Sequence, residues 1–250
     1  MPRVLALLFL TIPGLASAEA WRATYTVTAA GVPVLDSIVT LQFEGDAYRV
    51  ESLNRSRGLA SWIVSLRNTT RSDGVFDGDR PRPRQFSLDG VVRGRPRHVL
   101  VEYGRDGNPV VRRAEPPSRE ERHPVSEAET RGTVDQLSAI AMLVRVTART
   151  GRCDGQVRVF DARQVTDFRS SSAGIERFQD GQALRCQVET RILAGARLDR
   201  DPVEAARPQP VTAWIASPGP GLPPLPLRIE LTSRWWGGVT ATLSGVERMP

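Results

Sequence analysis

The sequence has 250 residues, with 34 basic residues against 28 acidic ones, a formal net charge of +6, and arginine at every basic position. The absence of lysine fits a GC-rich genome, whose codons favour arginine. Guanidinium groups also bind phosphate and carboxylate through paired hydrogen bonds, so the surface suits anionic partners. Beyond the first residues, no stretch approaches the ~20 apolar residues of a membrane-spanning helix, which excludes a protein built of such helices.

The N-terminus has the three parts of a secretory signal peptide. A basic residue, Arg3, precedes an apolar run from Val4 to Leu15, and Ala16-Ser17-Ala18 forms a small-residue cleavage site. We therefore expect cleavage after Ala18 and a single β-rich domain over residues 19–250 in the periplasm. Export makes nucleic acid an improbable partner and leaves anionic lipid head groups or cell-wall polymers as candidates.

Alternating apolar and polar residues dominate the first half of the chain. Trp21, Ala23, Tyr25 and Val27 share one face of an expected strand. The segment 37–52 reads as a hairpin, because a Glu-Gly-Asp turn separates two alternating runs. The segment 58–66 breaks the alternation and fits either a short helix or a bulged turn. Further strands are predicted at 67–74, 85–88, 98–103 and 109–113.

One convincing helix lies at the centre of the chain, after a Pro- and Glu-rich segment at 114–131 that we interpret as an exposed loop. The helix spans 133–150, where Thr133 and Gln136 have the spacing of a capping box and Gly151 follows the last turn. Its apolar stripe consists of Val134, Leu137, Ile140, Ala141 and Val144.

Strand patterns return after the helix, at 156–161, 164–170, 174–179 and 183–193. An irregular segment at 199–210 precedes the last three runs, which are 211–217, 225–233 and 239–246. The sequence thus predicts a mainly β fold, a curved antiparallel sheet or barrel of about a dozen strands with one central amphipathic helix.

The two cysteines, Cys153 and Cys186, are expected to form a structural disulfide in an oxidising compartment. A redox or metal pair would need closer spacing or nearby histidines. Between them, Asp161 and Arg163 stand where a hairpin turn is expected. They are either solvated turn residues, with Asp161 bonding the backbone two residues on, or an exposed pair that binds an anion or a partner.

Catalytic and metal-binding signals are weak. The histidines, His98 and His123, have no evident partners, and no G-x-S-x-G motif occurs. No cluster has the spacing of metal ligands, so we predict no metal, no cofactor and no enzymatic activity. A pair of carboxylates that meets only in space is the catalytic arrangement that stays open.

Two further features are candidate binding elements. Nine arginines between Arg80 and Arg113, among them Arg93, Arg95 and Arg97, form a basic lobe that either protects strand edges or approaches phosphate groups. The pair Trp235 and Trp236, beside two glycines, either belongs to the core or lines the mouth of a ligand cavity.

Several segments, in this order, resemble a family of exported proteobacterial proteins, domain-of-unknown-function family 3108. They are "RSRGLASWIVSLRNTTRSDG", "TVDQLSAIAMLVR", "VRVFDARQVTDF" and "LPLRIELTS". The family's Asp-Gly-Arg-Arg appears here as Asp161-Ala162-Arg163-Gln164. The resemblance implies export and a β-rich fold but no reaction; by looser analogy, the pattern is similar to periplasmic half-barrels that carry lipoproteins.

These observations favour a non-catalytic periplasmic protein that binds a hydrophobic or anionic component of the envelope, such as lipid, lipoprotein or peptidoglycan. The alternatives are a carboxylate-dependent hydrolase of envelope substrates and a structural protein-interaction module.

Overall fold

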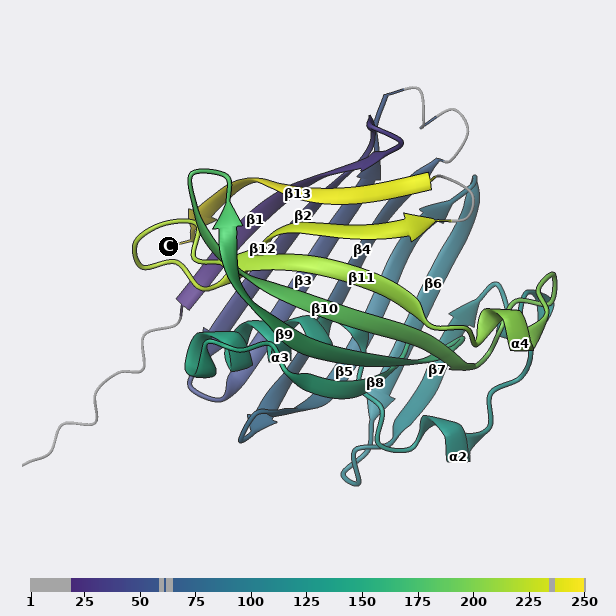
Figure 1. Ribbon diagram of the computed structural model, residues 1–250. Helices are drawn as coiled ribbons and strands as arrows, with labels where there is room; N and C mark the ends of the chain where they lie inside the picture. The colour runs from purple at the N-terminus through teal and green to yellow at the C-terminus, as the bar shows by residue number, and fades with distance from the viewer. Residues whose placement is uncertain (1–18, 59–60, 62–64, 234–236, 250) are drawn as a thin grey trace, which may run out of the picture.

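The computed structural model describes residues 19–58, 61, 65–233 and 237–249, and across them the chain forms one antiparallel sheet of thirteen strands (Figure 1). The strands are β1 (Glu19–Ala29), β2 (Val32–Glu44), β3 (Ala47–Ser56), β4 (Leu66–Asp77), β5 (Arg80–Val92), β6 (Arg95–Tyr103), β7 (Pro109–Glu115), β8 (Gly155–Phe160), β9 (Val165–Phe178), β10 (Gly181–Ala194), β11 (Gln209–Ala216), β12 (Leu225–Ser233) and β13 (Gly237–Arg248). The predicted fold class is confirmed.

Neighbours in the sheet are mostly neighbours in sequence. The order is β7-β6-β5-β4-β3-β2-β1-β13-β12-β11-β10-β9-β8, so β1 and β13 join the two halves of the chain and β7 and β8 are the edges. The sheet curves back on itself: β2 to β7 lie behind in Figure 1, and β8 to β13 lie in front. One concave face is therefore shared by both halves.

The central helix, α3 (Gln136–Thr150), lies inside this curve. Asp135 caps it: Oδ1 accepts hydrogen bonds from the backbone N–H groups of Leu137 and Ser138, both at 2.9 Å. The predicted capping box of Thr133 and Gln136 is wrong, because a carboxylate one residue before the helix satisfies both orphan donors directly. Gly151 ends the helix in the left-handed conformation, as predicted.

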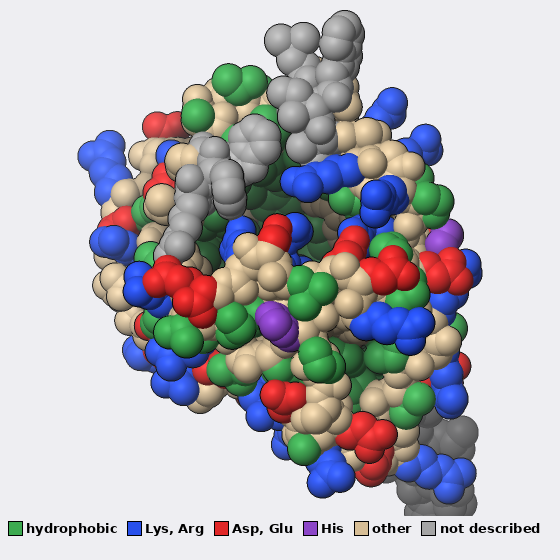
Figure 2. Space-filling view, turned by 90° about the vertical axis from the view of Figure 1, so that its right-hand side faces the viewer, with side chains coloured by type: hydrophobic (Ala, Val, Ile, Leu, Met, Phe, Trp, Pro, Cys, Tyr) green, Lys and Arg blue, Asp and Glu red, His purple; other side chains and the backbone are tan. Residues whose placement is uncertain are grey.

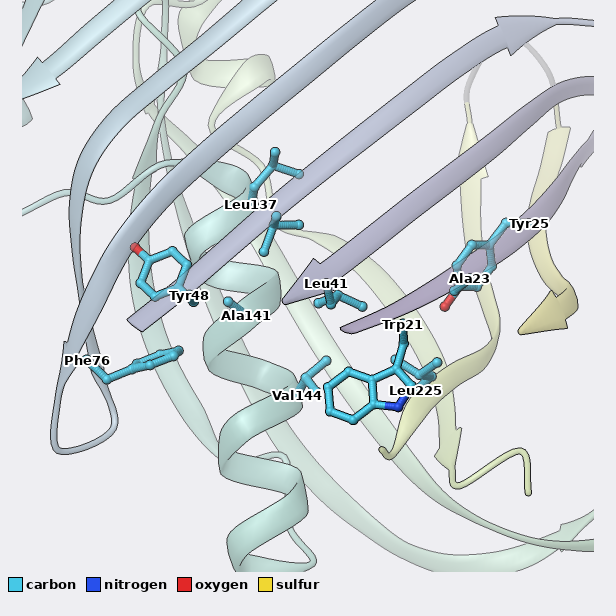
Figure 3. Packing of buried hydrophobic residues seen from close by; sticks show 11 residues of the cluster. Trp21, Ala23, Tyr25, Leu41, Tyr48, Phe76, Leu137, Ala141, Val144 and Leu225 are labelled. Carbon is cyan, nitrogen blue, oxygen red and sulfur yellow. The ribbon is translucent and has the colours of Figure 1, made fainter. Parts of the chain in front are cut away.

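The main core lies between α3 and the concave face of the first strands (Figure 3). The alternating residues Trp21, Ala23 and Tyr25 of β1 all face it, which confirms the predicted strand. Its other buried members are Leu41, Tyr48, Val50, Phe76, Leu137, Ala141, Val144 and Leu225. Burial of this apolar surface holds the helix in the sheet.

Several predicted boundaries are wrong. The two strands expected at 164–170 and 174–179 are one strand, β9, since Gly174 continues the extended backbone with a positive φ rather than starting a turn. The segment 114–131 contains the end of β7, a 3-10 turn (Ser118–Glu120) and α2 (Glu127–Thr130). The irregular segment 199–210 contains α4 (Pro202–Ala205). Most of 58–66 lies outside the described residues.

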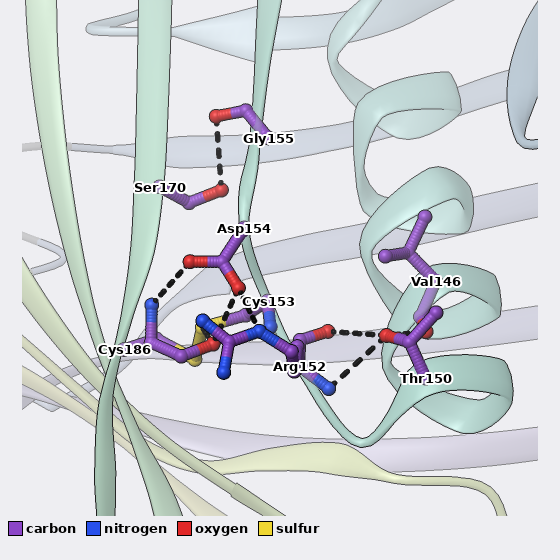
Figure 4. A network of polar contacts seen from close by, with 9 residues as sticks. Val146, Thr150, Arg152, Cys153, Asp154, Gly155, Ser170 and Cys186 are labelled. Atoms are coloured by element: carbon purple, nitrogen blue, oxygen red, sulfur yellow. Dashed lines mark hydrogen bonds and ion pairs between the residues drawn. A yellow bond between two sulfur atoms is a disulfide. The ribbon is translucent and has the colours of Figure 1, made fainter.

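Cys153 and Cys186 form the predicted disulfide, with their Cα atoms 6.2 Å apart. The bond ties the segment after α3 to β10, and it packs with Ala213 and Ile215 in a second part of the core. Figure 4 shows the bond beside Asp154, whose Oδ2 accepts a hydrogen bond from the Arg152 Nε–H at 2.6 Å. These contacts fix the path from the helix into β8.

Candidate functional site

The strongest candidate is a cavity of about 890 Å³ at one end of the concave face. It is lined by Gln164, Thr166, Phe168, Thr190, Ile192, Arg200, Asp201, Glu204, Ala205, Gln209, Pro210, Val211, Leu231 and Thr232. Gln164 lies in the β8–β9 turn, and the others come from the ends of β9 to β12 or from the connection that contains α4. Figure 2, which looks at this end of the molecule, shows a hollow with hydrophobic side chains inside it and arginine side chains near it.

Strand alternation explains why the cavity wall is apolar. On β11, Ala213 and Ile215 pack beside the disulfide, and Val211 lies two residues earlier on the same face. On β12, Ile229 packs against the same cluster, and Leu231 lies two residues further on. The cavity is thus a continuation of the core face, beyond the part that α3 covers. Leu231 is 39% exposed there.

The rim of the cavity carries the charges. Asp201 caps α4, since its Oδ1 accepts a hydrogen bond from the Val203 N–H at 2.9 Å. Glu204 forms an ion pair with Arg207. Arg200, in contrast, makes no side-chain hydrogen bond or ion pair with any residue that the structure describes. The rim therefore offers one uncommitted guanidinium.

Behind the rim, a cluster of arginines surrounds a single carboxylate, Glu121. Arg97 binds it through two hydrogen bonds of 3.0 and 2.6 Å, and Arg163 approaches it at 3.4 Å. The hydrogen bonds from Arg97 hold the pKa of Glu121 below its usual range. Arg122 donates to the Gln164 Oε1 at 2.6 Å, which connects this cluster to the cavity wall. The cluster joins β6 to the β8–β9 turn.

Asp161 and Arg163 do not form an exposed pair. Asp161 Oδ1 accepts hydrogen bonds from the backbone N–H groups of Arg163 and Gln164, at 2.9 and 2.8 Å, as the turn interpretation predicted. The Arg163 side chain is 7% exposed and donates to the carbonyl oxygen of Pro116 at 2.7 Å. Burial lowers the pKa of its guanidinium, and the positive charge of Arg97 adds to this effect. The alternative hypothesis, that Asp161 and Arg163 form an exposed pair that binds an anion, is therefore wrong.

The other predicted binding residues lie away from the cavity wall. Arg93 and Arg95 are exposed at the β5–β6 turn, and Arg97 is bound to Glu121, so none of the three lines the cavity. Trp235 and Trp236 lie outside the described residues.

Sequence reasoning missed Arg200 and Glu121. The Asp-Pro pair at 201–202, a common start of a helix, was the available signal for the rim.

Titratable groups elsewhere are engaged in structural contacts. His98, expected to lack a partner, lies 2.8 Å from Asp89 across the β5–β6 pair. Asp135 is fully buried, and burial raises the pKa of its carboxyl above the usual range. It also accepts hydrogen bonds from the Ser72 and Ser138 hydroxyls, at 2.9 and 2.6 Å. Across the described residues, no group of His, Cys, Asp and Glu could hold a metal ion.

A second cavity, of about 610 Å³, lies at the opposite end of the sheet, beside the last turns of α3. It is lined by Glu19, Trp21, Phe43, Val144, Arg145, Thr147, Ala148, Arg149, Gly221, Leu222, Pro223 and Pro224. Its cations are paired, Arg145 with Asp46 and Arg149 with Asp79. It therefore lacks the uncommitted guanidinium of the first cavity, and its remaining charged lining residue, Glu19, is an acid.

Comparison with known proteins first gives the class of fold. The chain is similar to the β-barrel-like protein of domain of unknown function DUF1849 from Brucella abortus, with a TM-score of 0.52 and 13% identity over 92% of this chain and 98% of that one. At this identity the likeness shows the fold alone. The sequence then gives the family: the model of the proteins of unknown function DUF3108 matches residues 24–244, and the chain belongs to that family. No curated protein matches it.

Within the described residues, no helix is long and apolar enough to cross a membrane.

Proposed function

We propose that this chain is a non-catalytic periplasmic protein that binds a hydrophobic or anionic component of the cell envelope. The observation that carries the proposal is the apolar cavity of about 890 Å³ on the concave face. Concave sites of this size, with apolar walls and a few polar groups, are typical ligand sites. A chain that only needed a stable core would gain by filling the space.

The compartment is supported by the leader pattern at residues 1–18 and by the disulfide, a bond that persists mainly in oxidising compartments. The non-catalytic reading is supported by the lining. Its two acids, Asp201 and Glu204, are engaged as a helix cap and as an ion-pair partner of Arg207. A hydrolase would need such acids placed to act on a substrate.

The test is binding of an uncharged, environment-sensitive dye, N-phenyl-1-naphthylamine, to protein purified from the periplasm. We expect saturable fluorescence enhancement, and we expect Leu231→Asp to abolish it. Leu53→Asp is the matched control, because Leu53 is 37% exposed against 39% for Leu231 but lies on the opposite face of the sheet. Equal dye binding by both variants, or none by the native protein, would refute the cavity as the ligand site.

A protein-interaction module is the second candidate, because the outer edge of β7 has no strand neighbour in the described sheet. Its Val110 and Val111 are 43% and 41% exposed. Such an edge can pair with a strand of another protein. If the ligand-binding function is correct, the double variant Val110→Asp with Val111→Asp should bind the dye normally as purified protein. Cells that carry the variant should also keep their resistance to envelope stress. Loss of stress resistance with intact dye binding would favour the module over the ligand-binding function.

A further inference from the structure

The charged residues of the cavity differ in what they contact. Asp199, next to the rim, has both carboxylate oxygens bound by Arg197, each at 2.8 Å. Asp201 and Glu204 are engaged as described above. Arg200 follows Asp199 directly, and its backbone N–H donates to the carbonyl oxygen of Arg197 at 3.1 Å, which fixes its Cα at the rim. Its guanidinium has no ion-pair partner within the described part of the chain, although it lines the cavity.

The apolar wall and the unpaired guanidinium of Arg200 together indicate the kind of ligand that would fit the cavity. The wall formed by Phe168, Ile192, Val211 and Leu231 suits a hydrocarbon chain. The guanidinium suits a carboxylate or a phosphate, which it binds through two parallel hydrogen bonds. A ligand that carries both parts satisfies the whole lining.

We propose that the cavity binds an anionic single-chain amphiphile, with its charged head on Arg200 and its chain along the wall of β9 to β12. This inference rests on the proposed ligand-binding function and names its ligand class. The volume of about 890 Å³ lies within the range of sites for one small ligand, which argues for a single chain. The head group is a carboxylate, as in a fatty acid, or a phosphate, as in a lysophospholipid.

Asp201 allows a second test, in which the expected effect on anion binding is opposite to that of removing Arg200. Its carboxylate lies on the same rim and repels an anionic head group. Asn caps helices as well as Asp does, so Asp201→Asn removes the charge and keeps the bond to the Val203 N–H. Binding of an anion should therefore tighten in this variant, whereas binding of an uncharged chain should stay the same.

The experiment is displacement of bound N-phenyl-1-naphthylamine by four probes that share a dodecyl chain: tridecanoate, dodecyl phosphate, dodecanol and dodecyltrimethylammonium. We expect both anions to displace the dye at lower concentration than the alcohol, and the cation to be weakest. In a second set of probes, fatty acids of increasing length, each added methylene should raise the affinity by about fourfold. Arg200→Gln should weaken the anions by about fivefold and leave the alcohol unchanged. The ratio of the two anions identifies the head group.

Arg248→Gln is the matched control, since Arg248 is exposed, lies at the opposite end of β13, and forms no ion pair with a described residue. Equal displacement by acid and alcohol, or equal effects of Arg200→Gln and Arg248→Gln, would overturn this inference and leave the proposed function standing. The inference would also be overturned if Arg95→Gln abolished the preference for anions over the alcohol while Arg200→Gln left that preference unchanged. Failure of the native protein to bind the dye would instead remove the proposed function, and this inference with it.

Discussion

Removal of the disulfide tests how much the link between the segment after α3 and β10 stabilises the fold. Cys153 and Cys186 are 33 residues apart, and a crosslink over that distance removes chain entropy from the unfolded state worth about 4 kcal/mol. For a chain of this size, each kcal/mol shifts the melting temperature by roughly 2–4 °C. We therefore expect Cys153→Ala with Cys186→Ala to melt roughly 8–16 °C below the native protein.

The assay is thermal unfolding followed by circular dichroism, for the oxidised protein, the reduced protein and the double variant. Both cysteine residues are 1% exposed, so the variant also loses buried contacts that the reduced protein keeps. The reduced protein should therefore melt between the other two. Equal melting temperatures for the oxidised and reduced forms would show that the crosslink does not constrain the unfolded chain, and would refute this reasoning.

Three further predictions concern a half-buried carboxylate, a buried carboxylate and the backbone. Glu121→Gln should cost about 2 kcal/mol in urea unfolding at neutral pH. Because Arg97 lowers the pKa of Glu121, the advantage of the native protein should be present above pH 4.5 and disappear as pH falls through the lowered pKa. Asp135→Ala should cost about 3 kcal/mol, and Asp135→Asn less. Because burial raises the pKa of Asp135, the native advantage over Asp135→Asn should be largest below pH 3.8 and shrink as pH rises. Gly195→Ala should prevent stable folding, because its Cβ would lie 2.1 Å from the Arg163 carbonyl oxygen, whereas Gly31→Ala, with a similar positive φ and nothing within 4 Å, should cost only about 1 kcal/mol in the same assay.

The strands were predictable because a half-buried sheet imposes a period of two on its residues, and Trp21, Ala23 and Tyr25 follow it without interruption. The disulfide was predictable from the leader pattern at residues 1–18 and from the count of cysteines. The helix cap was not, since Thr133 and Asp135 both satisfy local capping rules. The choice between them depends on Ser72, a residue of β4 that reaches the Asp135 carboxylate.

The candidate site was predictable only in kind. Sequence patterns indicated a cavity and a basic group, but assigned the charge to Arg93, Arg95 and Arg97. The fold changes that assignment: Glu121 neutralises Arg97, and Arg93 and Arg95 do not line the cavity. Such contacts join residues 24 or more positions apart, and local patterns carry no information on them. Arg200 is proposed to bind an anion because the neighbouring acids, Asp199, Asp201 and Glu204, are engaged by other groups.

The lengths of the elements explain why a cavity exists at this end. The fifteen residues of α3 span about 22 Å along the helix axis. The fourteen residues of β9 and of β10 span about 46 Å each. A helix of that length cannot cover the concave face from end to end. It contacts β3, β4, β5 and β8, and Figure 1 shows it at the end of the sheet away from α4. The apolar alternation nevertheless continues along the strands to Ile192, Val211 and Leu231. Since apolar residues on an open face cost solubility unless something covers them, their persistence beyond the helix is the strongest argument that a ligand completes the core.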